Sequence, residues 1–430
     1  MTGLLFGTMF LLIFIGLPVA FAIELSGVAL LALTGLKPMV LIAQRLATGL
    51  DSFQLLAVPL FILVGNLMGE GGISRRLVDW AETLVGHMPG GLGCVTIVAS
   101  AFFAALTGSG PATVAGIGAI MIPSMVAAGY TKERAAGLAA AAGALGPVIP
   151  PSIPMIVYGI TMNVSVPAMF MAGFIPGLFI ALSLIGVNTY YSFKSPAIMA
   201  SRSLKPFSIN DFFRKTIAAL GALLLPFIIL GGIYGGIFTP TEAAAIGVAY
   251  SLFVSLVIYK ELHIKDLPKM LINTMEMSAM VGLIIAAANV LTWMIAITKT
   301  SDIIVTFLSG FIAHKAAYLI IVNLFLIFVG ALMDTVASII IFAPVLVPIG
   351  IQLGLEPLHI GVLFCINLVI GYITPPFGYN LFTAVALTKL KFEQVVRGVL
   401  PFMITEMVCI FILAFCPWLI TWLPAWLGMR

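Results

Sequence analysis

The chain has 430 residues, of which 62% are hydrophobic and 8% are charged, and its formal net charge is +4. Soluble domains carry about 25% charged residues, so these side chains cannot cover a water-exposed surface and most of the chain must face lipid. The same composition excludes a disordered protein, a secreted disulfide scaffold and a nucleic-acid binder.

Long apolar runs predict membrane-spanning helices, because a spanning helix needs about 20 apolar residues. We predict such helices at 4–34, 52–69, 167–193, 213–233, 239–259, 274–297 and 395–426. No basic segment precedes the first run, and its apolar pattern continues after Glu24. We therefore interpret it as a first transmembrane helix rather than as a cleaved signal peptide.

Other apolar segments are interrupted by glycine and proline. Helical hairpins are predicted at 91–128 and 316–352, and broken helices at 134–161 and 356–388. Two shorter amphipathic segments precede the hairpins, at 74–85 and 300–312. They are too short and too polar to span, so we expect both to lie along the membrane interface.

The distribution of basic loops predicts the orientation in the membrane. The loops 194–215 and 260–269 carry an excess of lysine and arginine and are predicted to be cytoplasmic, whereas 232–238 is uncharged and predicted to be external. Counting spans outward from these loops places the N-terminus inside. The same count places the segment 300–312 and the C-terminus outside.

An internal repeat relates two parts of the chain at an offset of 225 residues. Pro123 corresponds to Pro348, and Pro150-Pro151 corresponds to Pro375-Pro376. Each unit then consists of an interfacial helix, a hairpin, a broken helix and a spanning helix. The loop charges orient the two units oppositely, and such an inverted repeat is typical of secondary transporters. The alternative is a duplicated helical bundle that does not transport.

These features predict the fold class. We expect an all-α polytopic membrane protein with inverted repeats, two re-entrant helical hairpins and two discontinuous helices, which is the architecture of elevator-type ion transporters.

The interruptions carry the candidate site. A chain that stops being helical at membrane depth exposes backbone N–H and C=O groups that need a partner. Free carbonyls suit a cation and free N–H groups suit an anion, and each Pro-Pro frees carbonyls that precede it. The predicted Na⁺ ligands are Gly108, Ser109, Gly110, Gly146, Pro147, Ile149, Pro150, Asp334, Thr335, Gly371, Thr374 and Pro375. The predicted substrate-binding residues are Thr107, Pro111, Thr113, Ser152, Ser338 and Asn380.

Two acidic residues allow different interpretations. Asp334 is the one acid at a predicted hairpin tip, where it either ligates a cation or caps the second arm of the hairpin. Both interpretations stay open at this point. Glu242 follows Thr239 and Pro240, and this pattern predicts a capping box at a helix start.

Several motifs are absent from the sequence. No Walker A loop is present, which argues against ATP as the energy source, and no motif of a membrane protease or prenyl-transfer enzyme occurs. The cysteines lack CxxC spacing, so we interpret them as small core residues rather than as metal ligands or disulfides. We therefore expect no catalytic residues and no cofactor beyond Na⁺ as the coupling ion.

Five motifs resemble those of one family. They are VPLFILVG at 58–65, TGSGPAT at 107–113, GPVIPPS at 146–152, FTPTEAAA at 238–245 and GYITPP at 371–376. Together they resemble the DctM-type large permease of the tripartite ATP-independent periplasmic (TRAP) transporters, and the resemblance covers essentially the whole chain.

The resemblance implies a Na⁺-driven importer of organic acids in the bacterial inner membrane. It also implies two partners, a small four-helix membrane subunit of the DctQ type and a periplasmic solute-binding protein. Nothing precedes residue 1, so we expect the small subunit to be a separate chain. Sialic acid and C4-dicarboxylates are the substrate classes that the family suggests, with a preference here for sialic acid.

The resemblance further implies an elevator mechanism, in which a transport domain slides within a scaffold. We expect the scaffold at 1–73 and 199–299, arms at 74–85 and 300–312, and the transport domain at 86–198 and 313–430. The alternatives are a stand-alone Na⁺/anion symporter of similar architecture, a channel and a membrane partner that does not transport.

Overall fold

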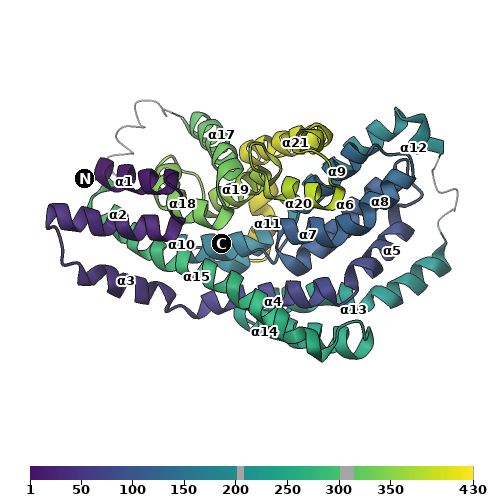
Figure 1. The fold of residues 1–430 in the computed structure, drawn as a ribbon, viewed down its shortest axis with the longest axis horizontal. Coiled ribbons are helices and arrows are strands. Elements are labelled where there is room, and N and C mark those ends of the chain that lie inside the picture. Colours follow the sequence, from purple (N-terminus) through teal and green to yellow (C-terminus); the bar gives the residue numbers. More distant parts are fainter. Residues whose placement is uncertain (201–207, 301–313, 430) are drawn as a thin grey trace.

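The computed structural model describes residues 1–200, 208–300 and 314–429, and this part of the chain contains helices and no strand (Figure 1). Nine of its helices are long and apolar enough to cross a membrane. The helices up to the first hairpin are α1 (Thr2–Phe14), α2 (Val19–Thr34), α3 (Val40–Leu50), the short η1 (Phe53–Leu56), α4 (Ala57–Glu70) and α5 (Ile73–Val85).

The first repeat unit continues as predicted. Its hairpin has one straight arm, α6 (Gly91–Thr107), and a second arm formed by α7 (Gly110–Thr113), the π-turn η2 (Val114–Gly118) and α8 (Ala119–Ala127). The broken helix follows as α9 (Lys132–Ala144) and α10 (Ile153–Met162). The long helix α11 (Val166–Phe193) and the short α12 (Pro196–Ala200) complete this part of the chain.

The middle of the chain contains the long helices α13 (Ile209–Tyr234), α14 (Pro240–Phe253) with the π-turn η3 (Val254–Ile258), and α15 (Leu267–Ile297), which is preceded by η4 (Ile264–Asp266). The predicted capping box is confirmed, since Thr239 Oγ1 accepts a hydrogen bond from the Glu242 N–H and the Glu242 carboxylate accepts one from the Thr239 N–H.

The second unit repeats the order of the first. Its hairpin is α17 (Lys315–Leu332) and α18 (Thr335–Gln352), and its broken helix is α19 (Pro357–Ile370), the turn η5 (Gly371–Ile373) and α20 (Tyr379–Thr388). The chain ends in α21 (Phe392–Phe415) and α22 (Trp418–Trp426). The predicted arm at 300–312 lies, apart from Thr300, outside the described residues.

The repeat has a defined register. The second arms of the two hairpins begin at Gly110 and Thr335, which are 225 positions apart. Beyond the breaks the offset is 226, because α10 begins at Ile153 and α20 at Tyr379. The second unit therefore has two residues, Phe377 and Gly378, between its Pro-Pro dipeptide and the next helix, where the first unit has Ser152 alone.

The prediction of a single spanning helix at 4–34 is wrong. The run forms two short helices, α1 and α2, which pack side by side at one end of the molecule (Figure 1). Between them Gly16 has a φ of +98° and Pro18 occupies the N-cap of α2. A proline lacks the N–H that a continuous helix would need, so the chain turns back at this point.

The N-terminus and Thr300, the first residue of the predicted external arm, cannot lie on opposite sides of the membrane as predicted. Thr2 Oγ1 lies 3.1 Å from Thr300 Oγ1, so the N-terminus and the start of the predicted external arm are adjacent. The charges of the loops predict an internal N-terminus and an external arm, on opposite sides of the membrane. The 31-residue helix α15 joins Thr300 to the basic loop 260–269, so a cytoplasmic loop there requires an external N-terminus. The prediction counts 4–34 as one span, whereas the chain forms two helices there and turns back between them.

Two further differences concern short helices. The predicted span 395–426 is divided into α21 and α22, since Cys416 leaves the helical region and Pro417 follows it. The helix α3, which contains Gln44 and Arg45, was not predicted. These two polar residues interrupt the apolar run, so a search for long apolar segments does not find this helix.

The helices pack in two sets. In one set α15 packs against α2, α3 and α4, and α14 packs against α4 and α13. In the other, α9 of the first repeat unit packs most extensively against α21 of the second, and also against α20. The two units therefore share one packed body rather than forming separate halves.

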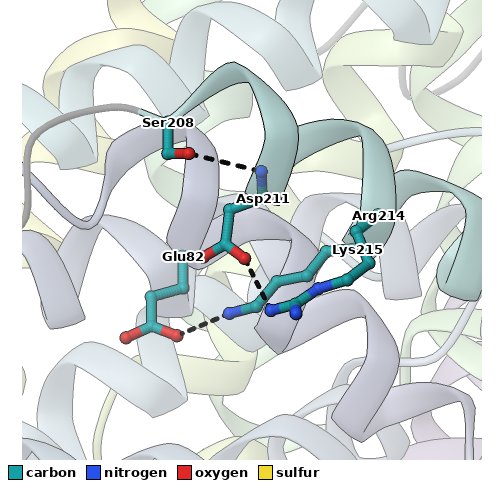
Figure 2. A network of polar contacts seen from close by, with 5 residues as sticks. All are labelled: Glu82, Ser208, Asp211, Arg214 and Lys215. Atoms are coloured by element: carbon teal, nitrogen blue, oxygen red, sulfur yellow. Dashed lines mark hydrogen bonds and ion pairs between the residues drawn. The ribbon is translucent and has the colours of Figure 1, made fainter.

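The predicted arm α5 contacts both sets, since it packs against α13 and against α6. Figure 2 shows its link to α13, where Lys215 Nζ lies 3.2 Å from Glu82 Oε2. Ser208 caps the start of α13, and Arg214 pairs with Asp211 on the same helix. At the other end of α5, Arg76 lies 2.6 Å from Glu261. One ion pair therefore joins the arm to α13, and the other joins it to the segment that follows η3.

The crossing of α9 and α21 depends on glycine. A Cβ atom on Gly398 would overlap the carbonyl oxygen of Glu133, and one on Gly137 would overlap the backbone of Gly398. We predict that Gly398→Ala lowers the free energy of unfolding by about 1–3 kcal/mol, because overpacking forces the two backbones apart. Thermal unfolding of the purified protein in detergent measures this loss.

The matched control is Gly186→Ala on α11, where a Cβ atom would meet nothing within 4 Å. Alanine favours a helix over glycine by up to about 1 kcal/mol, so this variant is expected to be as stable as the parent or more so. Equal melting temperatures for the two variants would contradict the packing argument.

Candidate functional site

The tip of the first hairpin is a tight turn. Helix α6 ends at Thr107, Gly108 has a φ of +58°, and Ser109 is extended before α7 begins. Thr113 Oγ1 donates a hydrogen bond of 2.8 Å to the Ser109 carbonyl and lies 3.2 Å from Thr107 Oγ1. The Ser109 hydroxyl makes no hydrogen bond within the described residues and is therefore free for a ligand.

The tip of the second hairpin is organised by a carboxylate. Asp334 Oδ2 accepts hydrogen bonds from the backbone N–H of Val336 at 2.9 Å and of Ala337 at 3.4 Å. Ser338 Oγ donates to the Asp334 carbonyl at 2.8 Å. Asp334 is thus the N-cap of α18, which confirms one of its two interpretations. The other interpretation, a cation ligand, stays a prediction.

Both breaks release backbone carbonyls. In the first, Ser152 caps α10 by accepting from the Met155 N–H, and it donates to the Pro147 carbonyl. In the second, Thr374 Oγ1 donates to the Ile370 carbonyl at 2.9 Å. Among the described residues, no hydrogen bond reaches the carbonyls of Ile149 and Thr374, which precede the two Pro-Pro dipeptides. Both Pro-Pro peptide bonds are cis.

The four interruptions meet one another. A Cβ atom on Gly146, in the first break, would lie 2.6 Å from the Ser109 carbonyl at the first tip. One on Gly110 would lie 3.1 Å from the ring of Tyr372 in the second break. The Tyr372 hydroxyl donates to Asp334 Oδ1 at the second tip, over 3.3 Å. Glycine at these contact points is what lets the backbones approach.

Asn380 joins the two repeat units. Its Nδ2 donates a hydrogen bond of 3.0 Å to the Ala140 carbonyl on α9. Its Oδ1 faces Gly110, where a Cβ atom would lie only 2.7 Å away. The residue is fully buried, and Oδ1 has no hydrogen-bond partner among the described residues. A buried acceptor without a partner is expected to be costly, so Asn380 is poised to accept from a bound group.

The structure therefore brings the predicted site residues to one place, at four interruptions that touch one another. Thr113 and Ser338 correspond in the repeat and are already engaged, since each donates to the carbonyl at its own hairpin tip. Thr335 is fully buried at the first position of α18, and no described residue hydrogen-bonds its hydroxyl. Tyr372 was not predicted, although it lies inside the 371–376 motif.

The donor set decides what this region can bind. Within the described residues no three histidine, cysteine or acidic side chains form a cluster. The groups that converge are carbonyls, hydroxyls, an amide and one carboxylate. Oxygen donors suit hard cations, whereas zinc and copper prefer nitrogen and sulfur. The residues present therefore fit Na⁺.

Comparison with known proteins identifies relatives across the whole chain. The model of the family "Tripartite ATP-independent periplasmic transporter, DctM component" matches residues 6–419. The sialic acid TRAP transporter large permease protein SiaM of Vibrio cholerae is 36% identical, over 99% of this chain and 98% of that protein. The C4-dicarboxylate TRAP transporter large permease protein DctM of Pseudomonas aeruginosa is 38% identical, over 95% of each.

One relative is longer than this chain. The isethionate TRAP transporter permease protein DctMQ of Oleidesulfovibrio alaskensis is 38% identical over 96% of this chain, which spans 65% of that protein. Among solved structures, the YdaH transporter of Alcanivorax borkumensis has a TM-score of 0.54 at 13% identity. The match covers 86% of this chain and 87% of that one, and it supports the fold alone.

The two interpretations of Asp334 can be separated by substitution. Asp334→Ala removes the N-cap and is expected to lower stability by about 0.5–2 kcal/mol. Asn is as good an N-cap as Asp, so Asp334→Asn is expected to melt near the parent temperature while losing the charge. If the carboxylate also ligates a cation, Na⁺ will raise the melting temperature of the parent more than that of Asp334→Asn. Equal Na⁺ effects in both would leave Asp334 as a cap only.

Proposed function

Since the chain belongs to the DctM family of TRAP transporter large permeases, we propose that it imports a small organic anion by Na⁺ symport. Membership in the family makes it an integral protein of the inner membrane and a transport component rather than an enzyme. The single observation that carries the Na⁺ proposal is the meeting of four helix interruptions around oxygen donors.

The substrate is proposed as a class. The relatives are named for isethionate, sialic acid and C4-dicarboxylates, which are all anions of organic acids at neutral pH. Their identities to this chain, 36–38%, do not separate these substrates. We propose a carboxylate or sulfonate solute, with sialic acid and the C4-dicarboxylates as the first to test.

Two partners are part of the proposal. A small membrane subunit is supported by the relative named DctMQ, which extends beyond the region matched by this chain. A periplasmic solute-binding protein is supported by the family description, which names a tripartite transporter. A soluble binding protein would deliver the solute to the external face of the permease.

We propose an elevator mechanism because of the backbone groups at the interruptions. Separating the two tips and the two breaks would expose unpaired N–H and C=O groups to lipid, at several kcal/mol each. Moving them together as one body avoids that cost.

The body would be 86–198 with 313–430, and the scaffold 1–73 with 199–299. We propose that the arm stays with the scaffold, because one ion pair joins it to α13 (Figure 2) and a second joins it to Glu261, and that its joint lies between α5 and α6.

The test of the function is uptake into proteoliposomes that contain the chain, its small subunit and the binding protein. We predict uptake of labelled sialic acid, succinate or isethionate that depends on an inward Na⁺ gradient. Choline in place of Na⁺ is expected to abolish uptake, and ATP is expected to have no effect. Uptake that persists in choline, or that requires ATP, would refute Na⁺ symport.

Omitting the binding protein separates the proposal from its main alternative. A stand-alone Na⁺/anion symporter would transport equally well without it, whereas a TRAP permease is expected to lose nearly all uptake. No uptake of any of these anions under either condition would favour a membrane partner that does not transport.

The elevator proposal predicts opposite effects for two crosslinks that share one residue. Phe342 on α18 lies 6.3 Å, between ring centroids, from Phe10 on α1, and 5.1 Å from Phe325 on α17. In a Cys416→Ser background, a short thiol crosslinker between cysteines at 10 and 342 joins scaffold to moving body and is expected to block uptake. The same crosslinker between 325 and 342 lies within one hairpin and is expected to be tolerated. The reverse pattern would contradict rigid-body movement.

A further inference from the structure

A cavity of about 460 Å³ lies away from the interruptions, between α3, α15 and the end of α10. Its volume is in the range of small-ligand pockets, about 300–1,000 Å³. The polar side chains that line it come from all three helices: Arg45, Thr161, Asn163, Asn289 and Thr292. On one side of the cavity is the proposed scaffold, and on the other is the end of the first broken helix.

The position of the cavity follows from the packing of α3 on α15. A Cβ atom on Gly49 would contact Ala286 and Asn289, and Ile42 and Met294 both lie beside Gly27, so the two helices are antiparallel. The lining residues of α15 lie in its C-terminal half, toward Thr300 and the N-terminus. This is the side opposite the basic loop 260–269, and it is external when that loop is cytoplasmic.

Arg45 is the charged group of this cavity. Its Cζ lies 5.7 Å from the centroid of the Trp293 ring. Within the described residues its guanidinium has no ion pair and no side-chain hydrogen bond. Trp293 and Asn289 lie about 6–12 Å along the helix axis from the end of α15, at 1.5 Å per residue. Arg45 is exposed rather than buried, so its unpaired charge is open to a solute that enters the cavity.

The neighbours of Arg45 are suited to an organic anion. Asn163, the C-cap of α10 with a φ of +54°, lines the cavity together with Asn289 and Thr292 of α15. A guanidinium binds carboxylate, sulfonate or phosphate through two parallel hydrogen bonds. Amides and a hydroxyl around it can bind the hydroxyl or amide groups of the same solute.

We infer that this cavity is an external vestibule in which Arg45 captures the anionic solute before it reaches the interruptions. The inference rests on the proposed function and adds a site to it. Arg45 belongs to the proposed scaffold, so it would concentrate and orient the solute and would not travel with it. The competing source of the same chemistry is the phosphate of an anionic lipid.

A charge-selective labelling experiment tests the vestibule without any transport. The full-length chain with its small subunit carries Cys416→Ser and a reporter cysteine, Thr292→Cys, in right-side-out vesicles. Labelling rates are compared for two membrane-impermeant methanethiosulfonates, one bearing a sulfonate and one a quaternary ammonium group. Arg45→Gln is expected to lower the anion-to-cation rate ratio about 10-fold, because one positive charge within several ångströms is removed.

Two control variants accompany the labelling of Arg45→Gln. Arg45→Lys keeps the charge and is expected to preserve the ratio. Arg214→Gln removes an exposed cation on α13, which is paired with Asp211, and is expected to leave the ratio unchanged. A ratio that does not change in Arg45→Gln, or that changes equally in Arg214→Gln, would overturn the inference.

Protection separates a solute from a lipid. Sialic acid, succinate or isethionate in solution is expected to slow labelling by the anionic reagent when Arg45 is present. In proteoliposomes, replacing phosphatidylcholine by phosphatidylglycerol is expected to have no such effect. Protection by phosphatidylglycerol alone would assign the cavity to a lipid headgroup and overturn the vestibule.

Measuring uptake is the last part of the test. Arg45→Gln is expected to raise the KM for the solute about 10-fold and to leave the Na⁺ concentration for half-maximal uptake unchanged. If the parent protein shows Na⁺-dependent uptake and Arg45→Gln has the same KM, the vestibule fails while the function stands. If the parent shows no uptake, the proposed function fails, and the labelling ratio still reports whether the cavity selects anions.

Discussion

The requirement that every backbone polar group find a partner at membrane depth governs this fold. Four interruptions in the helices leave N–H and C=O groups that neither lipid nor a helix can satisfy. The structure brings these interruptions together, with Gly146 against Ser109 and Gly110 against Tyr372. The packing of α9 on α21 and α20 holds them in place. The site is thus a property of the backbone, and the glycines are where side chains would prevent its assembly.

The sequence predicted the elements that depend on repeated, strong signals and missed those that depend on one residue. Both hairpins and both broken helices were predicted because Gly and Pro recur at a fixed offset. The turn between α1 and α2 depends on Gly16 and Pro18 alone, and a hydropathy window averages over such a break. That error also led to opposite sides for the N-terminus and Thr300, which the structure places next to each other.

The candidate site was predicted unevenly for a physical reason. A Pro-Pro dipeptide leaves the preceding backbone carbonyls without a helical partner, and this can be read from the sequence alone. The free carbonyls at both breaks could therefore be predicted. Tyr372 bridges Gly110 and Asp334 through tertiary contacts, and an aromatic residue in an apolar run gives no sign of this. Asp334 had two interpretations because a carboxylate at a helix start can cap and ligate with the same oxygens. Only coordinates could show that the cap is formed.

The extra residue after the second Pro-Pro dipeptide makes the two units chemically unequal. Because the offset grows from 225 to 226, the N-cap of α20 that corresponds to Ser152 is Gly378, which has a φ of +64° and no side chain to offer. One unit therefore supplies a hydroxyl where the other supplies bare backbone. If the two breaks hold ions as proposed, those ions would differ in affinity and would bind and leave in a preferred order. The two structurally similar units would then act at different times in the transport cycle.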